Sequence, residues 1–284
     1  MWHGGEKGRQ GESTLSPLPL LLLLAAGISG WLVACVSVAT PTPTSPPVAL
    51  RVGFDELVRP LAEAVVPIFG DETPEVVVET EIGHADDLLE SLHAAQLDAL
   101  FVPGEHWDKG ELWTSVVALD GIALIANRDN PVMGLALSQV QSVFQGQFWS
   151  WQAVGGAPAE IEVVTPAEGL AAWDLFQEMV MQENRITLTA VVLPDPETVM
   201  EYVASHPWAV GYVGAAAVDD RVKVLAVDGL FPTPDTLADH SYLLHFPIYL
   251  VMERDPSGTA RRLPAWLMSR DGQAVIGRSY GRVR

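Results

Sequence analysis

Residues 115–156 read SVVALDGIALIANRDNPVMGLALSQVQSVFQGQFWSWQAVGG, and this stretch decides how the rest of the chain is arranged. The near-continuous apolar run 122–126 ends in the polar turn 127–131, which is typical of a strand buried on both faces. Apolar residues at 137, 140, 143 and 144 then have helical spacing, so we expect a helix that Ser138 caps and Gly146 ends. The stretch therefore predicts a covered strand followed by a short helix.

Strands and helices are predicted to alternate on both sides of this stretch. Strands are expected at 48–53, 75–79, 97–102, 161–164, 187–193 and 209–213, and helices at 57–69, 87–95, 170–181 and 195–205. Such alternation predicts an α/β fold with right-handed βαβ units and mainly parallel sheets. Ligands of such sheets bind at the carboxyl ends of the strands, so we expect the loops 53–56, 83–86 and 102–105 to face one cleft.

The composition limits the kinds of partner and chemistry. A hydrophobic content of 49% supports a substantial core, and a net charge of −20 argues against nucleic acid, whose phosphates need clustered Lys and Arg. The sequence has no Gly-x-Ser-x-Gly elbow, no His-Glu-x-x-His motif and no phosphate-cradling glycine loop that ends in Lys. We therefore expect a protein that is not an enzyme and has no cofactor.

The N-terminal region has the features of an export signal. Lys7 and Arg9 precede the largely apolar segment 18–38, and Leu32-Val33-Ala34-Cys35 resembles the bacterial lipobox. We therefore expect a signal peptide over residues 1–35, lipidation of Cys35, and a Pro/Thr-rich tether over residues 36–47. An uncleaved signal anchor would give the same topology, with the folded body outside the cell membrane.

Residues 48–284 resemble a known family in the order of their segments and in the residues of each segment. The stretch 119–156 is similar to the segment "LDAIAVIVNPDNPV, L-x-x-L-x-x-IF-x-G, WSEVGG" of the phosphate-binding proteins of phosphate ABC importers, and Gly211-Tyr212 and 242–251 match further family segments. The resemblance implies a type II periplasmic-binding-protein-like fold within the PBP-like superfamily. Its two lobes would comprise 48–122 plus 244–284 and 123–243, joined by two crossover strands, and a ligand would bind between them.

The residues that hold the oxyanion in such relatives are replaced here. The family motif reads about "SR-x-x-GSGTR-x-x-F", and this chain has Thr165-Pro166-Ala167-Glu168-Gly169-Leu170-Ala171-Ala172-Trp173-Asp174-Leu175-Phe176. Pro166 and Trp173 stand where the two Arg residues would be, and residues 170–172 replace Ser-Gly-Thr. Carboxylates at 55 and 56 would repel a desolvated phosphate, so we expect phosphate binding to be lost.

The replacing residues suit a different ligand. The candidate ligand-binding residues are Phe54, Asp55, Glu56, His84, Asp86, Pro103, Asp120, Gly169, Leu170, Ala171, Ala172 and Trp173. Carboxylates with the face of Trp173 suit an organic amine, and His84 with Asp oxygens suits a divalent metal that His106 and Asp108 could join, although we expect no metal site. Ordinary helix caps at Asp55 and Asp86, with Trp173 in packing, account for the same residues without a ligand.

Three functional hypotheses follow. The first is an extracytoplasmic solute-binding lipoprotein that captures a small ligand and hands it to an ABC permease. The second is a sensor or interaction lipoprotein that keeps the fold but has lost transport and phosphate binding. The third is an oxyanion-importer component that holds its ligand by backbone amides alone.

Overall fold

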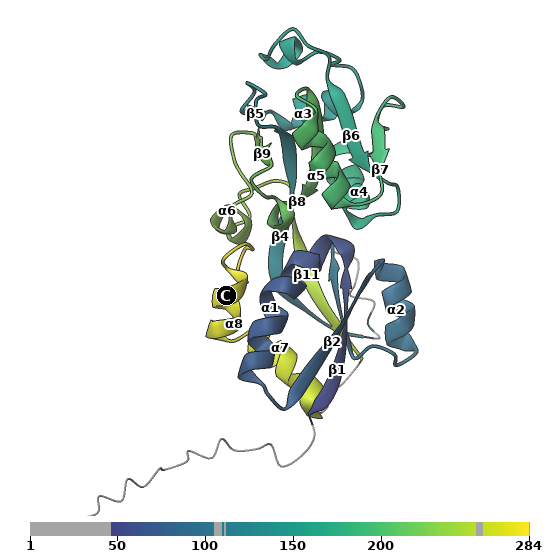
Figure 1. The fold of residues 1–284 in the computed structure, drawn as a ribbon, viewed down its shortest axis with the longest axis vertical. Coiled ribbons are helices and arrows are strands. Elements are labelled where there is room, and N and C mark those ends of the chain that lie inside the picture. The colour runs from purple at the N-terminus through teal and green to yellow at the C-terminus, as the bar shows by residue number, and fades with distance from the viewer. Residues whose placement is uncertain (1–46, 105–109, 111, 254–257, 284) are drawn as a thin grey trace, which may run out of the picture. The chain divides into compact units, whose positions relative to one another are not determined.

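The computed structural model describes residues 47–104, 110, 112–253 and 258–283 (Figure 1). The expected signal peptide, the lipidation site Cys35 and the tether up to residue 46 lie outside these residues, as do His106 and Asp108. No described helix is long and apolar enough to cross a membrane. This statement does not cover the apolar segment 18–38, which lies outside the described residues.

The first lobe is built on a parallel sheet with the strand order β2-β1-β3. Its strands are β1 (Val48–Asp55), β2 (Val76–Gly83) and β3 (Ala99–Pro103). The 3-10 turn η1 (Glu56–Val58) leads into helix α1 (Arg59–Glu72), and helix α2 (Ala85–His93) follows β2. Figure 1 shows α1 and α2 on opposite sides of the β1–β2 pair. The ends of β1 and β2 lie side by side, because Asp55 pairs with Gly83 in the register.

Two long strands join the lobes. Strand β4 (Trp113–Asn127) pairs antiparallel with β11 (His245–Met252) along 113–121, and with β8 and β9 along 122–127. β11 also pairs antiparallel with β3. One nine-stranded sheet therefore runs through the described body. The predicted strand at 122–126 is only the second half of β4.

The second lobe continues this sheet with strands β6 (Glu162–Pro166), β7 (Val191–Leu193), β8 (Ala209–Gly214) and β9 (Val222–Val224). Strands β6, β7 and β8 are parallel to one another, whereas β4 runs antiparallel to β8. Strands β5 (Gly134–Leu135) and β10 (Ala226–Val227) form a separate pair. The expected two-lobed α/β fold is thus confirmed, and its strands form one mixed sheet with both parallel and antiparallel pairs.

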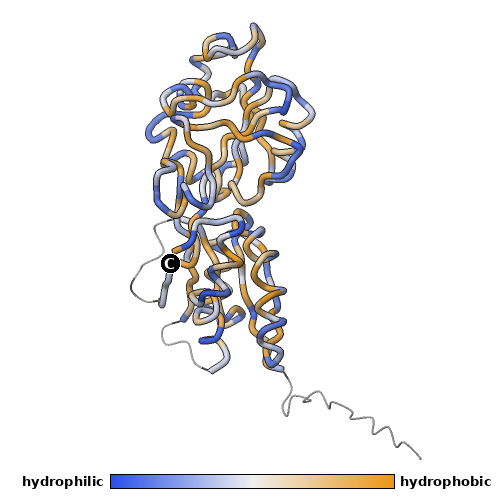
Figure 2. Tube along the Cα trace, turned by 90° about the vertical axis from the view of Figure 1, so that its left-hand side faces the viewer, coloured by the Kyte–Doolittle hydropathy of each residue, from blue (hydrophilic) through white to orange (hydrophobic). Residues whose placement is uncertain are grey.

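Helices cover both lobes. In the second lobe they are α3 (Leu137–Phe144), η2 (Trp151–Val154), α4 (Ala171–Phe176), a π-helical turn (Gln177–Met181), α5 (Pro196–Ser205), η4 (Ala215–Ala217) and α6 (Pro234–Ala238). The first lobe is completed by η5 (Gly258–Arg261), α7 (Arg262–Leu267) and α8 (Arg270–Ile276). Hydrophobic segments run through the middle of each lobe, whereas hydrophilic segments gather in its outer loops (Figure 2).

Three local predictions were wrong in detail. Ser138 does not cap α3, because the helix begins at Leu137 after Ala136. The single helix expected at 170–181 is α4 followed by a π-helical turn, and the strand expected at 187–193 is reduced to the three residues of β7. In contrast, the carboxylate of Asp195 accepts a hydrogen bond from the Thr198 amide at 2.8 Å and caps α5 as expected.

Candidate functional site

A cavity of about 300 Å³ lies between the two lobes. The first lobe contributes the ends of β1, β2 and β3 and the start of α2, and the second contributes the loop after β6 and one face of α4 and its π-helical turn. The lining consists of Asp55, His84, Ala85, Asp86, Pro103, Gly104, Gly169, Ala171, Asp174, Leu175 and Glu178. The described residues of the loops expected at 53–56, 83–86 and 102–105 therefore meet at one cleft, through Asp55, residues 84–86 and residues 103–104.

The charge of this cavity is its main chemical feature. Four lining side chains are carboxylates, and none of the described residues in the lining is Lys or Arg. Burial raises the pKa of Asp174, and the neighbouring charges of Asp86 and Glu168 raise it further. A cation placed here would relieve this repulsion, whereas an anion would add to it.

Asp55 forms the most buried polar wall of the cavity. Only 4% of the residue is exposed, and its Oδ1 accepts a hydrogen bond from the Leu57 amide at 2.9 Å. Burial raises the pKa of Asp55 to about 6, although hydrogen bonds from the amides of Leu57 and Ala85 and the nearby His84 act in the opposite direction. The carboxylate thus accepts hydrogen bonds from backbone amides just after the end of β1 and at the start of α2. Amides in such positions can otherwise bind an anionic ligand.

The other candidate ligand-binding residues either line the cavity or lie beside it. Pro103, Gly169, Ala171, His84 and Asp86 line the cavity with Asp55. Glu56, Leu170 and Ala172 lie beside it around a void of about 10 Å³ that also touches Asp55 and His84. Asp86 is inside the first turn of α2, so the expected N-cap position belongs to His84 instead.

Three candidates lie away from this lining. The ring of Phe54 is buried and stacks on Phe101 with 4.5 Å between ring centroids, which makes it a core residue. Trp173 lines a different groove of the second lobe together with Glu168 and Gln177, because it projects from another face of α4 than Ala171 and Asp174. Asp120 is fully buried on the crossover strand β4.

Sequence reasoning missed Asp174, Leu175 and Glu178, which supply the wall of the second lobe. A usable signal was present, because residues 171, 174, 175 and 178 have the i, i+3, i+4, i+7 spacing of one helical face. Ala85 and Gly104 were also missed. Each follows a residue that was named, and they line the cavity beside His84 and Pro103.

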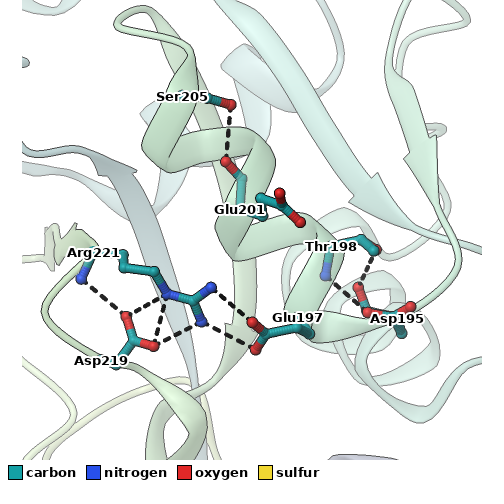
Figure 3. A network of polar contacts seen from close by, with 7 residues as sticks. All are labelled: Asp195, Glu197, Thr198, Glu201, Ser205, Asp219 and Arg221. Atoms are coloured by element: carbon teal, nitrogen blue, oxygen red, sulfur yellow. Dashed lines mark hydrogen bonds and ion pairs between the residues drawn. The ribbon is translucent and has the colours of Figure 1, made fainter.

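A second hollow of about 660 Å³ lies between α1 and α5 and is also rich in carboxylates. Glu56, Glu63, Asp195 and Glu197 line it, and Arg59 contributes a positive charge that lies 3.7 Å from Glu56. Figure 3 shows that Glu197 also holds Arg221, which Asp219 binds from the other side. Arg221 therefore forms ion pairs with two carboxylates of the second lobe.

The described side chains do not favour a metal centre. Among them, no group of three or more His, Cys, Asp and Glu residues is placed to hold a metal ion. The carboxylates of the cavity are spread over both of its walls. This spread suits contact with different parts of an organic molecule.

Comparisons with known proteins agree with this architecture. The model of the PBP superfamily domain matches residues 41–271. The phosphate-binding protein PstS of Bacillus subtilis (strain 168) is 23% identical over 234 residues, which is 80% of this chain and 78% of that protein. A structure of a candidate phosphate ABC transporter substrate-binding protein with bound phosphate, from Clostridium perfringens, has a TM-score of 0.76 at 25% identity and covers 83% of this chain and 100% of that one.

A third comparison supports the fold alone. An ABC-type phosphate transport receptor from Vibrio cholerae has a TM-score of 0.67 at 23% identity, covering 82% of this chain and 99% of that one. The match of the family model to most of the sequence and the two-lobed architecture lead to one conclusion. The chain belongs to the PBP superfamily, as an ABC-type substrate-binding protein of the phosphate-binding-protein-like kind.

Proposed function

We propose that this protein is an extracytoplasmic solute-binding lipoprotein of an ABC-type importer and that its ligand is a small organic cation. The ligand is captured between the lobes 48–122 plus 244–284 and 123–243, and it is handed to a membrane permease without catalysis. Cys35 carries the lipid anchor, and residues 36–47 tether the body to the outer face of the membrane.

The observation that carries the ligand class is the lining of the cavity between the lobes. Asp55, Asp86, Asp174 and Glu178 surround about 300 Å³, which accommodates a small organic molecule. An ammonium group gains charge-assisted hydrogen bonds from these carboxylates, whereas Pro103 and Leu175 offer apolar contact to its carbon skeleton. Phosphate, which the named relatives bind, would meet like charge at every one of these four side chains.

A thermal-shift titration tests this proposal. Primary, secondary and quaternary amines are each titrated to millimolar concentration, with phosphate, sulfate and molybdate as matched anions. At about 100 times its dissociation constant a ligand adds about 2.7 kcal/mol to the free energy of unfolding, which raises Tm by several degrees. We expect an amine to raise Tm and the anions to have no effect. A shift with phosphate would show that the cavity takes an oxyanion on backbone amides and would refute the proposed ligand class.

One observation favours a second candidate function, a sensor or interaction lipoprotein without a transported ligand. The Asp55 carboxylate already satisfies the Leu57 amide, so the anion site is filled by the chain itself. This candidate predicts that no small molecule in the panel raises Tm. A co-purifying membrane or cell-wall protein would then support the interaction role, and co-purification with permease subunits would support transport.

A further inference from the structure

Asp120 lies at the point where β4 crosses from one lobe to the other. It pairs with Phe246 of β11 in the first lobe, and from Ile122 onward β4 pairs with β8 of the second lobe. The residue is 0% exposed. Its Oδ1 accepts hydrogen bonds from the amides of Gly121 at 2.8 Å and Ala216 at 3.3 Å, so one carboxylate oxygen is held by both the crossover and the second lobe.

The second oxygen of Asp120 is buried and has no hydrogen-bond partner among the described residues. It faces the contact between the lobes, because a Cβ on Gly214 of β8 would lie 3.5 Å from this oxygen and 2.9 Å from Cδ1 of Leu57 in the first lobe. Leu57 and Gly214 therefore close the space around Asp120 from opposite lobes. If the lobes move apart, this contact separates and water reaches the carboxylate.

Within the described part of the chain, the groups that act on Asp120 provide no positive charge. Tyr242, in the turn before β11, donates its hydroxyl to the Ile122 carbonyl at 2.8 Å. Tyr280 lies in the C-terminal segment that pairs with Leu119, and no described residue forms a hydrogen bond with its buried hydroxyl. Burial raises the pKa of both phenols, and the Asp120 charge raises it further, so both stay neutral. Glu63 of α1 acts on Tyr280 with the same negative sign.

We propose that Asp120 is a proton-dependent latch, which holds the two lobes together when it is protonated and opens them when it is ionised. The proposal concerns the regulation of the binding site and therefore rests on the proposed solute-binding function. Burial of an ionised carboxylate without a counter-charge is unfavourable, and opening removes that cost by hydration. Protonation removes it without opening, so acid favours the closed arrangement.

The pKa of Asp120 determines the direction of the pH effect on closure and the pH range in which it occurs. Burial raises the pKa of Asp120 to about 7 in the arrangement seen here, and exposure to water returns it toward the ordinary value of about 4. Between about pH 4 and about pH 7, closure of the lobes is therefore accompanied by protonation of Asp120. The closure equilibrium shifts about tenfold between pH 8 and pH 6 toward the closed arrangement, and above pH 8 it changes little.

The direct test measures the distance between the lobes without any ligand. In the full chain, Cys35, the sole cysteine of the sequence, is replaced by Ser, and exposed Val77 and Leu188 are replaced by Cys for spin labels. We expect the population of the shorter label distance to rise between pH 8 and pH 6, and Asp120→Asn to abolish this change. Asp71→Asn on the exposed end of α1 is the matched control and should respond as the unmodified chain does.

The latch is overturned if the distances are independent of pH in the chain with native Asp120, or if Asp120→Asn leaves the response intact. The first of these readouts needs no substitution at Asp120, so the test stays decisive even if the variant fails to fold. Because no ligand is present, failure of the latch is separate from failure of the proposed function. Absence of any amine-induced Tm shift would refute the ligand class and leave the latch result standing.

Discussion

At the scale of single residues, the proposed ligand class depends most on Asp55, a buried carboxylate in the cavity lining. Its carboxylate is almost fully buried, yet the described residues place no Lys or Arg in the surrounding lining. Backbone amides hold it in place. A side chain that is fixed in this manner loses little entropy when a ligand binds to it, so under the proposed function Asp55 would be a preorganised anchor for an ammonium group.

Substitution of Asp55 by Asn is therefore expected to weaken amine binding by about ten- to a hundredfold, since a charge-assisted hydrogen bond contributes about 1.5–3 kcal/mol. The variant keeps an Oδ1 acceptor for the Leu57 amide, so the fold should be retained. Isothermal titration calorimetry checks the affinity. Asp87→Asn, on an exposed position of α2 outside the cavity lining, is the control.

The dependence of amine affinity on pH distinguishes the contribution of Asp55 from that of Asp120. Asp55 binds a cation only when ionised, and with its pKa raised to about 6 its contribution is lost as the pH falls through about 6. The Asp120 latch acts in the opposite direction. Amine affinity in Asp120→Asn should therefore fall between pH 8 and pH 5, and unchanged affinity over this range would contradict the role of Asp55.

At the scale of elements, η1 and the end of β8 lie in close contact between the lobes. Gly214 is the last residue of β8, and an added Cβ would come within 2.9 Å of Leu57, which belongs to η1 and is itself buried. The register of β4 with β8 sets the position of Gly214, and the turn that Asp55 caps sets the position of Leu57. Two elements far apart in the sequence thus meet beside the crossover.

Gly214→Ala is expected to hold the lobes apart and to weaken ligand binding severalfold, because a contact below 3.0 Å must be relieved by movement of Leu57 or of the lobe. Calorimetric affinity and the label distance described above measure the effect. Gly70→Ala in α1 is the control, since an added Cβ there meets nothing within 4 Å. Unaltered affinity in Gly214→Ala would show that the contact is not part of closure.

At the scale of the whole molecule, the proposed function needs the folded body to be retained outside the membrane. The lipobox-like Leu32-Val33-Ala34-Cys35 and the Pro/Thr-rich tether are the basis for this proposal. A lipid anchor with a tether of about 3 Å per residue would keep the binding protein near its permease and raise its effective concentration there.

Cys35→Ala is expected to abolish incorporation of labelled fatty acid and to shift the protein from the membrane fraction to the soluble extracytoplasmic fraction. Membrane retention of this variant without lipid incorporation would instead indicate an uncleaved signal anchor. Purified Cys35→Ala protein should bind ligand normally, because the cavity is built entirely from residues 55–178.

Much of the architecture was accessible from the sequence, because it depends on periodicity and turn chemistry. The buried run at 122–126, the βαβ alternation and the Asp195 cap all appear in the structure near their expected positions. The boundaries that failed are those where tertiary contacts override local preference. The pairing with β11 extends β4 back to Trp113, and the π-helical turn interrupts the helix expected at 170–181.

The sequence by itself determined the α/β fold class, the loops that meet at the cleft and the residue types that stand where the family motif has anion-binding side chains, since hydrophobic periodicity, turn residues and residue type are local properties. Only the tertiary structure decided which side chains share the cavity. Asp174 and Glu178 line the same cavity as Asp55 because the two lobes pack together. Trp173 lines a different groove because it projects from another face of α4. The uncompensated burial of Asp120 likewise arises from the packing of Leu57 and Gly214, which no local sequence pattern records.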